Sequence, residues 1–425
     1  KAKASRRMDG LEIDGGKPLH GDIIISGAKN AALPLLCLGL ITDAPLVLEN
    51  VPELADTISM EGLLRHHGVD VTRDGEKVTM RGGAKQYDAP YDLVRKMRAS
   101  VLVLGPLLAR YGEARVSLPG GCAIGTRPVD LHVRAMQGLG AVVELADGYI
   151  QARAPGGLIG GRVVFPMVSV GATENALMAA ALARGPSELV NVAREPEIID
   201  LANCLNAMGA KITGHGTGTI SVEGVDDLHG TTHAVISDRI EAGTFAIAAV
   251  MTGGDLTLQR TKARTLDALL MVLRETGATV TETGDTIRVV ANGRPVAADI
   301  TTDPFPGFPT DLQAQFTAMM CIADGSSRIS ETIFENRFMH VPELLRMGAD
   351  IQVDGGIAMV RGREALTPAP VMATDLRASV SLVLAALTIE GKSQISRIYH
   401  LDRGYSRLEE KLGNCGAHLR RIKVA

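Results

Sequence analysis

The chain has 425 residues, of which 46% are apolar and 22% charged; this ordinary globular usage excludes a mainly disordered protein. Its 44 basic and 48 acidic residues give a net charge of −4, which leaves no basic excess for binding nucleic acid through phosphates, and 3% aromatic residues argue against a base-stacking surface. The longest apolar stretch, around Val101–Ala109, is interrupted by Gly105 and Pro106 and is shorter than a bilayer span. We therefore expect a soluble protein without nucleic-acid or membrane partners.

The cysteines and the first residues predict a cytoplasmic protein. Five cysteines are scattered without a C-x-x-C pair, which favours free thiols over a zinc site or disulfides. Residues 1–7, K-A-K-A-S-R-R, form a basic extension with no apolar segment behind it, so we do not interpret them as a secretory signal. Met8 is a candidate for the original start.

A repeat organises the chain. Helical stretches that end in Gly-Ala or Gly-Val recur every 68 to 72 residues, and their glycines are Gly68, Gly140, Gly209, Gly277, Gly348 and Gly416. A near-constant period of this kind indicates one supersecondary unit present six times. In chain order, a repeat contains an apolar helix, an amphipathic helix and strands joined by turns.

Three segments exemplify these elements. Residues 69–80 alternate around an Asp-Gly turn and predict a strand pair. Residues 175–184 are apolar nearly all round, which predicts a buried helix. Residues 265–275 carry leucines at i, i+3, i+4 and i+7, which predicts an amphipathic helix.

The last repeat is incomplete, and the first strands supply what it lacks. The chain stops soon after Ala417, whereas residues 11–13 and 22–26 have the pattern of the missing strands. We expect them to complete the sixth repeat and to bring the termini together. Three repeats would then form one domain at 29–236, and 8–28 with 237–425 would form the second, with a ligand site in the cleft between them.

Two candidate sites precede the middle of the chain. Lys29, in Ser26–Asn30, falls at a predicted helix start, where it can serve an anion site or remain a solvated lysine. In P-G-G-C-A-I-G-T-R, Arg127 follows Cys122 and would favour a reactive thiolate; the alternative is an ordinary turn with an inert cysteine. We expect the other cysteines to be inert, and they are Cys37, Cys204, Cys321 and Cys415.

A carboxylate and several arginines are the later candidates. Thr310 or Asp311 can be an ordinary helix N-cap, or the prolines before them can position Asp311 as a base. One arginine beside an aspartate is usually a weak surface pair. Several together, with Lys29 and Arg127, would form a cationic pocket for a small polyanionic substrate; they are Arg98, Arg337, Arg377 and Arg403.

These segments resemble a known family over essentially the whole chain from Met8. The strings that carry the resemblance are S-G-A-K-N-A-A, M-R-A-S, P-G-G-C-A-I-G-T-R-P-V-D-L-H, V-S-V-G-A-T, F-P-T-D-L-Q-A-Q-F, F-E-N-R-F-M-H-V-P-E-L, T-D-L-R-A-S and H-L-D-R-G-Y. They are similar to the UDP-N-acetylglucosamine enolpyruvyl transferases. The resemblance implies an α/β fold, a two-domain inside-out α/β barrel of six similar units of about 70 residues.

The resemblance also implies a reaction. The enolpyruvyl group of phosphoenolpyruvate would pass to the 3-hydroxyl of UDP-N-acetylglucosamine with release of phosphate, without a metal or other cofactor. This is the first committed step of peptidoglycan precursor synthesis, which implies a role in cell wall biogenesis, cell shape and cell division in a bacterial cytoplasm.

The roles of single residues follow from the same resemblance. Cys122 would protonate the methylene carbon of phosphoenolpyruvate and can form a pyruvate adduct, and Asp311 would accept the proton of the sugar hydroxyl. Lys29, Arg127 and Arg403 would clamp phosphoenolpyruvate, with Asn30 at the reacting centre. The residues implied in binding the sugar nucleotide are Arg98, Arg127, Pro128, Val129, Asp130, Leu131, Met167, Val168, Ser169, Val170, Asp311 and Ile333.

One position departs from the family pattern, and two alternative functions fit the same repeats. Family members commonly have a lysine where this chain has Met167, so a side-chain contact to the nucleotide phosphate cannot be carried over. A 5-enolpyruvylshikimate-3-phosphate synthase has the same architecture, but it would not need the P-G-G-C loop. A low-activity paralogue that acts as a binding scaffold would be expected to lose residues such as Lys29, Cys122, Asp311 and Arg403, and all four are present.

Overall fold

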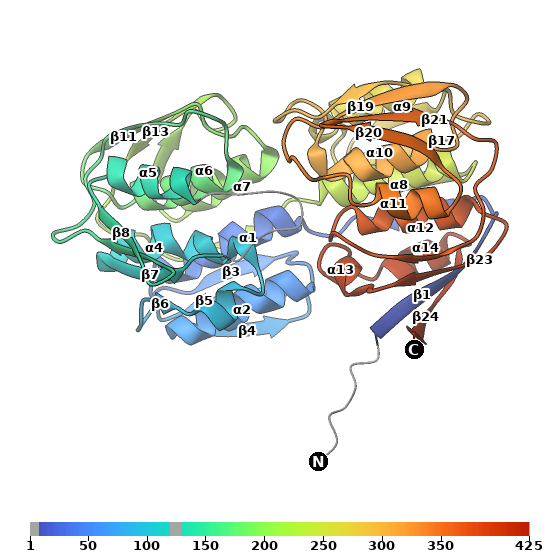
Figure 1. Cartoon of the computed structure of the whole chain (residues 1–425). Helices are drawn as coiled ribbons and strands as arrows, with labels where there is room; N and C mark the ends of the chain where they lie inside the picture. Colours follow the sequence, from blue (N-terminus) through green and yellow to red (C-terminus); the bar gives the residue numbers. More distant parts are fainter. Residues whose placement is uncertain (1–7, 120–128, 425) are drawn as a thin grey trace, which may run out of the picture. The chain divides into compact units, whose positions relative to one another are not determined.

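The computed structural model describes residues 8–119 and 129–424. The chain folds into two compact units (Figure 1). Here the first unit means residues 27–119 with 129–236, and the second unit means residues 8–26 with 237–424. Each unit contains three four-stranded sheets and the helices that pack on them.

The first unit is built on three sheets with the strand orders β14-β3-β5-β4, β6-β7-β9-β8 and β10-β11-β13-β12. Its strands are β3 (Leu46–Glu49), β4 (Asp70–Asp74), β5 (Lys77–Arg81), β6 (Asp88–Ala89), β7 (Glu113–Ser117), β8 (Val142–Ala146), β9 (Tyr149–Arg153), β10 (Arg162–Val164), β11 (Pro186–Val190), β12 (Lys211–Thr213), β13 (Thr219–Glu223) and β14 (Thr232–Ala234). Its helices are α1 (Lys29–Cys37), η1 (Leu38–Leu40), α2 (Ala55–His67), α3 (Tyr91–Val94), η2 (Arg98–Val103), α4 (Leu104–Tyr111), α5 (Asp130–Gly138), α6 (Val170–Ala180) and α7 (Pro196–Ala207).

The second unit repeats this plan with the strand orders β16-β17-β15-β2, β18-β19-β21-β20 and β22-β23-β1-β24. Its strands are β1 (Met8–Gly15), β2 (His20–Ile24), β15 (Asp255–Gln259), β16 (Thr279–Thr283), β17 (Thr286–Val290), β18 (Ile300–Thr301), β19 (Ser326–Ser330), β20 (Asp350–Asp354), β21 (Ile357–Arg361), β22 (Pro370–Met372), β23 (Gly391–Ser396) and β24 (His418–Val424). Its helices are α8 (Arg239–Met251), η3 (Ala263–Thr265), α9 (Asp267–Glu275), η4 (Thr310–Leu312), α10 (Gln313–Met320), α11 (Val341–Arg346), α12 (Ser379–Thr388), α13 (Tyr399–Asp402) and α14 (Leu408–Asn414).

The helices confirm the predicted periodicities. Every residue of α6 from Ala172 to Ala180 is buried, as expected for a helix that is apolar nearly all round. In α9 the buried side chains include Leu269, Leu270 and Leu273, which form the predicted amphipathic face. Because the apolar helices are covered on all sides, each unit has its own buried core.

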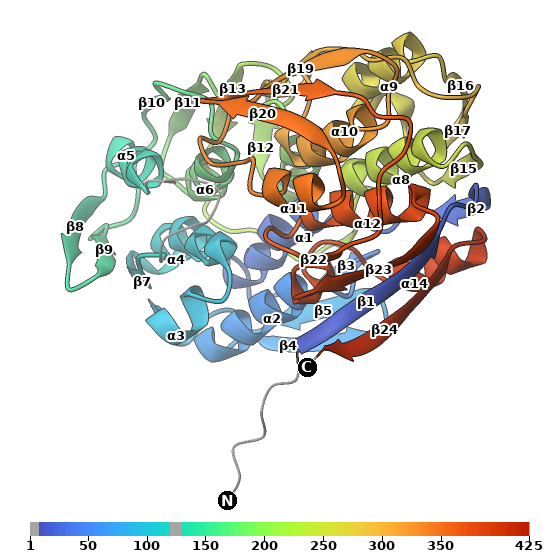
Figure 2. The same ribbon diagram turned by 45° about the vertical axis from the view of Figure 1, so that its right-hand side comes forward.

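The N-terminal strands were predicted in part correctly. β1 lies between β23 and β24, with Gly10 opposite Ser396 and Met8 opposite Val424, so β1 completes the sixth repeat (Figure 2). The expectation that residues 22–26 belong to the same sheet is wrong, because β2 pairs in parallel with β15. Each sheet in the described chain has one such parallel edge strand. In four sheets this strand (β6, β10, β18 or β22) directly precedes the helices of its own repeat, whereas β2 and β14 pair with a strand from a distant part of the chain.

The structure thus confirms an α/β fold of six repeated sheet-and-helix units. Across residues 8–119 and 129–424, the helices are too short or too polar to cross a bilayer.

Candidate active site

Lys29 is a buried cation at the start of α1. A Cβ at Gly27 would lie only 1.7 Å from the carbonyl oxygen of Asn50, so glycine is required where the chain enters this helix. Lys29 is 6% exposed, and its Nζ lies 3.0 Å from Oδ2 of Asp56, which belongs to the first turn of α2. The alternative of a solvated lysine is therefore wrong. Asn30 follows in α1 and is half-buried.

The start of α6 presents backbone donors on the first unit. The Oγ of Ser169 accepts a hydrogen bond from the N–H of Ala172 at 3.3 Å, and this caps the helix. The N–H groups of Val170 and Gly171 precede the first intrahelical bond, which runs from Thr173 to the Ser169 carbonyl. Free N–H groups and the positive end of the helix dipole together favour an anion at this point.

The other residues implied in nucleotide binding flank this helix. Met167 is 63% exposed and carries no charge, whereas Val168 is half-buried. Arg98 is the first residue of η2, and both η2 and α5 pack on α6. Val129 caps α5 and is buried; Asp130 is exposed and Leu131 is half-buried. Cys122, Arg127 and Pro128 lie outside the described residues.

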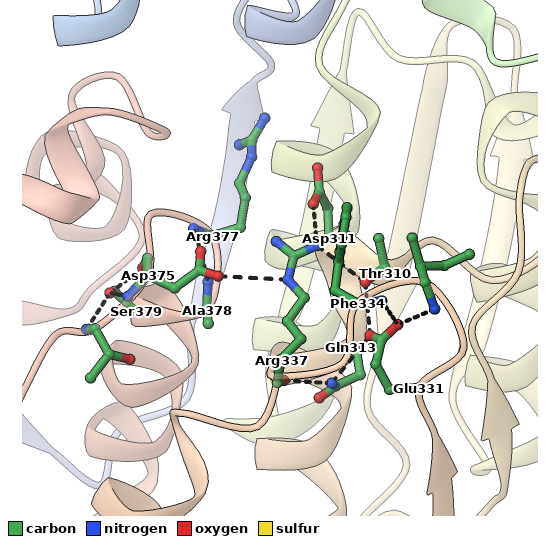
Figure 3. A network of polar contacts seen from close by, with 12 residues as sticks. Thr310, Asp311, Gln313, Glu331, Phe334, Arg337, Asp375, Arg377, Ala378 and Ser379 are labelled. Atoms are coloured by element: carbon green, nitrogen blue, oxygen red, sulfur yellow. Dashed lines mark hydrogen bonds and ion pairs between the residues drawn. The ribbon is translucent and has the colours of Figure 1, made fainter. Parts of the chain in front are cut away.

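Asp311 in the second unit is held by a buried arginine. Oδ1 of Asp311 lies 2.8 Å from Nη1 of Arg337, and Nε of the same guanidinium lies 3.6 Å from Oδ2 of Asp375. Figure 3 shows the guanidinium between the two carboxylates. Burial opposes the charge of Arg337, but Asp311 and Asp375 outweigh it, so the pKa of Arg337 is raised. The carboxylate of Asp311 is therefore held by a charge-assisted contact to a buried cation.

The expected alternative of an N-cap at this position is wrong. The caps of η4 and α10 are Pro309 and Leu312, and neither helix has a side-chain cap. Thr310 instead donates its Oγ1 hydrogen to Glu331 at 2.7 Å. The carboxylate of Asp311 is therefore left to interact with Arg337, and 24% of this side chain is exposed.

Glu331 fixes the loop that contains Ile333. Its carboxylate accepts hydrogen bonds from Thr302 at 2.8 Å, from Gln313 at 3.3 Å and from the Ile333 N–H at 2.9 Å, besides the bond from Thr310. Because Glu331 takes the N–H of Ile333, the group that remains for a backbone contact to a ligand is the Ile333 carbonyl.

Arg377 and Arg403 differ in their surroundings. Arg377 is 2% exposed; its Nη2 lies 2.9 Å from Asp238, and its Nη1 donates to the Gly404 carbonyl at 2.8 Å. The neighbouring Asp238 raises the pKa of Arg377 despite burial. Arg403 is the C-cap residue that follows α13, and it is half-buried. Arg377 therefore holds the Arg403–Gly404 turn against the start of α8.

The cysteines of the described chain are buried thiols, as expected. Burial raises the pKa of Cys37, and it raises those of Cys204 and Cys321 to about 12. The pKa of Cys415 is also raised by burial. These four thiols are free and protonated. In the part of the chain that the structure describes, His, Cys, Asp and Glu side chains form no cluster of three suited to a metal ion.

Asp56 and Glu331 are site residues that the sequence patterns did not single out. Asp56 is 27 positions from Lys29, and Glu331 is 20 positions from Asp311. Their roles depend on contacts between separate elements, which short motifs do not reveal. The sequence offered one signal, since Glu331 closely precedes the F-E-N-R segment that carries Arg337.

The fold resembles solved enolpyruvyl transferases. The enolpyruvyl transferase NikO from Streptomyces tendae superimposes with a TM-score of 0.85 at 26% identity and covers 98% of this chain and 100% of its own. An EPSP synthase from Acinetobacter baumannii gives a TM-score of 0.73 at 19% identity over 97% of this chain and 100% of its own, a likeness of fold alone.

Sequence relatives agree with this likeness. Residues 13–412 match the family described as EPSP synthase (3-phosphoshikimate 1-carboxyvinyltransferase). UDP-N-acetylglucosamine 1-carboxyvinyltransferases from Gluconacetobacter diazotrophicus and Sinorhizobium fredii are each 58% identical over 98% of this chain and 100% of their own length. The enzyme of that name from Caulobacter vibrioides is also 58% identical, over 98% of both chains. This chain therefore belongs to the UDP-N-acetylglucosamine 1-carboxyvinyltransferases, within the enolpyruvyl transferase family.

Proposed function

We propose that the protein transfers the enolpyruvyl group of phosphoenolpyruvate to the 3-hydroxyl of UDP-N-acetylglucosamine and releases phosphate. The observation that carries this proposal is the 58% identity to enzymes named for this reaction over nearly the full length of both chains. The reaction commits the sugar nucleotide to peptidoglycan precursor synthesis. We further propose that it takes place in the cytoplasm and serves cell wall biogenesis, cell shape and cell division.

The chemistry requires an acid and a base. The 3-hydroxyl oxygen forms a bond to C2 of phosphoenolpyruvate while C3 receives a proton, which gives a tetrahedral intermediate. Phosphate then leaves C2 and a proton leaves C3, so that the double bond is restored. We assign the proton donor to Cys122, which can also form a pyruvate adduct, and the base to Asp311. The ion pair between Asp311 and Arg337 supports the second assignment, because a guanidinium at 2.8 Å orients the carboxylate and a neighbouring cation favours the charged form of a carboxyl group.

The charge of the substrates calls for fixed cations. Phosphoenolpyruvate brings a phosphate and a carboxylate, and the sugar nucleotide brings a diphosphate. We assign Lys29, Arg127 and Arg403 to phosphoenolpyruvate, with Asn30 at the reacting centre. The burial of Lys29 supports this assignment, because a desolvated ammonium interacts more strongly with an anion than an exposed one does.

Residues around the start of α6 in the first unit, and Asp311 and Ile333 in the second unit, are assigned to the sugar nucleotide. We propose that Arg98, Asp311 and the Ile333 carbonyl contact it, together with the runs Arg127–Leu131 and Met167–Val170. Since Met167 has no charge, the contact to the diphosphate there would come from backbone N–H groups at the helix start. The half-buried first residues of α6, Val170 and Gly171, support this arrangement.

Phosphate release tests the proposal. The protein is incubated with phosphoenolpyruvate and either UDP-N-acetylglucosamine or shikimate 3-phosphate. We expect release with the sugar nucleotide, loss of that release in Cys122→Ala, and normal release in the control Cys415→Ala, whose buried thiol is outside the proposed chemistry. Release with shikimate 3-phosphate instead would overturn the acceptor assignment. No release with either acceptor would favour a binding scaffold.

A further inference from the structure

Asn175, inside α6, has a side-chain amide whose orientation is settled by its neighbours. Oδ1 accepts a hydrogen bond from the backbone N–H of Gly105 at 2.8 Å, and Nδ2 donates one to the backbone carbonyl of Val101 at 3.0 Å. A backbone N–H can only donate and a carbonyl can only accept, so the amide cannot be flipped. Asn175 is fully buried, which makes each of these bonds costly to break.

The second amide hydrogen of Asn175 determines the state of His132. Nδ2 lies 2.8 Å from Nδ1 of His132, and its remaining hydrogen points to this nitrogen. Nδ1 must therefore accept, and the proton of the neutral ring resides on Nε2. Burial and the nearby charge of Arg98 lower the pKa of His132 to about 4. The ring thus stays neutral near pH 7, with Nε2–H as a fixed donor.

The Nε2 edge of this ring lies against the first turn of α6. A Cβ built on Gly171 would be 3.2 Å from Cε1 and 3.4 Å from Nε2 of His132. The turn is the one whose Val170 and Gly171 N–H groups make no intrahelical bond. The hydrogen bond that the described residues give this ring is at Nδ1, so Nε2 is left for a ligand. The half-buried ring therefore offers its N–H beside the other donors of this turn.

We propose that Asn175 is a positioning residue that locks His132 as an Nε2–H donor for the diphosphate of the sugar nucleotide. This inference rests on the proposed function and adds two residues, Asn175 and His132, to the proposed nucleotide site. The opposite tautomer would aim a lone pair at the phosphate oxygens and would repel them. Arg98, the start of α6 and the locked imidazole would together form a donor set without the lysine that Met167 replaces.

The tautomer can be measured directly on the wild-type protein. A 15N spectrum of histidine-labelled protein distinguishes protonated from unprotonated ring nitrogens, and His132→Gln assigns the signal among the ten histidines. We expect a protonated Nε2 and an unprotonated Nδ1 near pH 7. We also expect UDP alone, used as a probe, to shift the Nε2 signal. A protonated Nδ1, or an Nε2 signal that UDP leaves unmoved, would overturn the proposal even if the enzyme proved inactive.

Asn175→Asp tests the lock through kinetics. A carboxylate can only accept, so Nδ1 would carry the proton and the neutral ring would lose the proton on Nε2. We expect the KM for UDP-N-acetylglucosamine to rise about tenfold at high pH, where the ring is neutral, with kcat nearly unchanged. At lower pH the ring would become doubly protonated and the KM would recover. In the wild type this pH dependence would be absent.

Two controls separate positioning from general damage. Asn203→Asp makes the same change at an exposed pair, in which His215 lies 3.2 Å from Asn203, and the KM should not change. In a His132→Gln background, Asn175→Asp should have no further pH-dependent effect on the KM. A rise in KM that persists in that background, or that is equal at all pH values, would overturn the proposal. If the wild-type protein had no activity toward UDP-N-acetylglucosamine, the proposed function would be refuted. The NMR measurement would still decide which nitrogen of His132 carries the proton and whether UDP shifts its signal.

Discussion

Arg337 places one guanidinium between two carboxylates, and only 4% of the residue is exposed. Because the guanidinium is so little exposed, ions from the solvent screen its attraction to the two carboxylates only weakly. Arg337 also anchors through its backbone, because its carbonyl accepts a hydrogen bond from Gln313 at 2.8 Å. The carboxylate of Asp311 is therefore fixed in direction as well as in charge, and a base needs both.

Replacing Arg337 by methionine tests whether this arginine fixes the charge and the direction of the Asp311 carboxylate. Methionine keeps much of the length but removes the charge, so Asp311 would take up a proton at higher pH and would lose its orientation. We expect kcat to fall roughly 100-fold or more, as for the loss of a general base, and the acid limb of the pH–rate profile to move to higher pH. Steady-state kinetics between pH 5 and 9 provide the measurement.

Arg337→Lys and Arg288→Met are the comparisons for this change. The lysine retains the charge without the planar fork, so the acid limb should return toward its original position while kcat recovers only in part. Arg288 pairs with Asp255 on an exposed strand surface, and its loss should leave the profile unchanged. An unshifted acid limb in Arg337→Met would show that Arg337 does not control the charge of the base.

His340 is a second buried group, and it lies near the charges of Arg337 and Asp375. It is 1% exposed, and in the described chain neither ring nitrogen has a hydrogen-bond partner. Burial lowers its pKa to about 4, with Asp375 opposing the shift and Arg337 adding to it. The folded protein thus holds His340 neutral in a pH range where the unfolded chain binds a proton. Its contribution to stability is full above about pH 6.5 and is lost as the pH falls toward 4.

We expect His340→Leu to remove this pH dependence. Relative to the variant, the wild type should lose up to about 1.4 kcal/mol of unfolding free energy per pH unit between 6.5 and 4. Melting temperatures of both proteins at several pH values measure the difference. His418→Leu, at an exposed histidine, is the matched control and should show a smaller change. A constant difference between wild type and His340→Leu across the range would contradict the buried neutral state.

At the scale of elements, the sequence predicted what depends on periodicity and missed what depends on distant partners. The helices α6 and α9 were predicted because burial on one or all sides leaves a pattern in the residues themselves. The partner of β2 was missed, because a strand's pattern does not say which strand pairs with it. The helix start at Lys29 was predicted, but its ion pair with Asp56 was not.

The N-cap alternative for Thr310 or Asp311 is wrong for the same reason. An aspartate before a helix is usually a cap, and the local sequence offers no reason to prefer Arg337 as its partner. The competing contact comes from a loop that Glu331 holds in place through side-chain and backbone bonds. The site is therefore built by one element orienting another, which a single motif cannot encode.

Glu331→Gln tests this element-level anchor. The amide keeps the shape but replaces one acceptor oxygen by a donor, so that the buried Thr302 or the half-buried Thr310 would lose its acceptor. We expect a loss of about 1–3 kcal/mol in stability and a raised KM for UDP-N-acetylglucosamine, because the Ile333 carbonyl would shift. Calorimetry and steady-state kinetics measure the two effects.

Glu335→Gln makes the same change in the same loop at an exposed position and should leave both quantities unchanged. A variant Glu331→Gln that is less stable but has an unchanged KM would restrict Glu331 to folding. If Glu331→Gln changed neither the stability nor the KM, the hydrogen bonds to Glu331 would contribute less free energy than buried charge-assisted hydrogen bonds usually do.

At the scale of the whole molecule, the two units take their strands from different parts of the sequence. The strands of the first unit all lie between residues 46 and 234, whereas the second unit draws β1 and β2 from the N-terminal end and its remaining strands from the C-terminal half. β1 pairs with strands that lie far away in the chain: Gly15 is opposite Gly391, 376 positions on, and Met8 is opposite Val424, 416 positions on. Pairing at such separation carries a large loop-closure cost, which buried side chains on β1 must offset.

Ile13→Ala measures how far the second unit depends on this strand. Ile13 is 0% exposed and lies in the core of the second unit, so its truncation should cost about 2–5 kcal/mol. Since the core of the first unit contains no residue of β1, we expect faster hydrogen exchange in peptides from β23 and β24 and unchanged exchange in peptides from α4 and α6. Asp14→Ala, exposed on the same strand, should change neither. Equal acceleration in both units would mean that they unfold as one cooperative body, and the chain ends would then stabilise the whole protein and not the second unit alone.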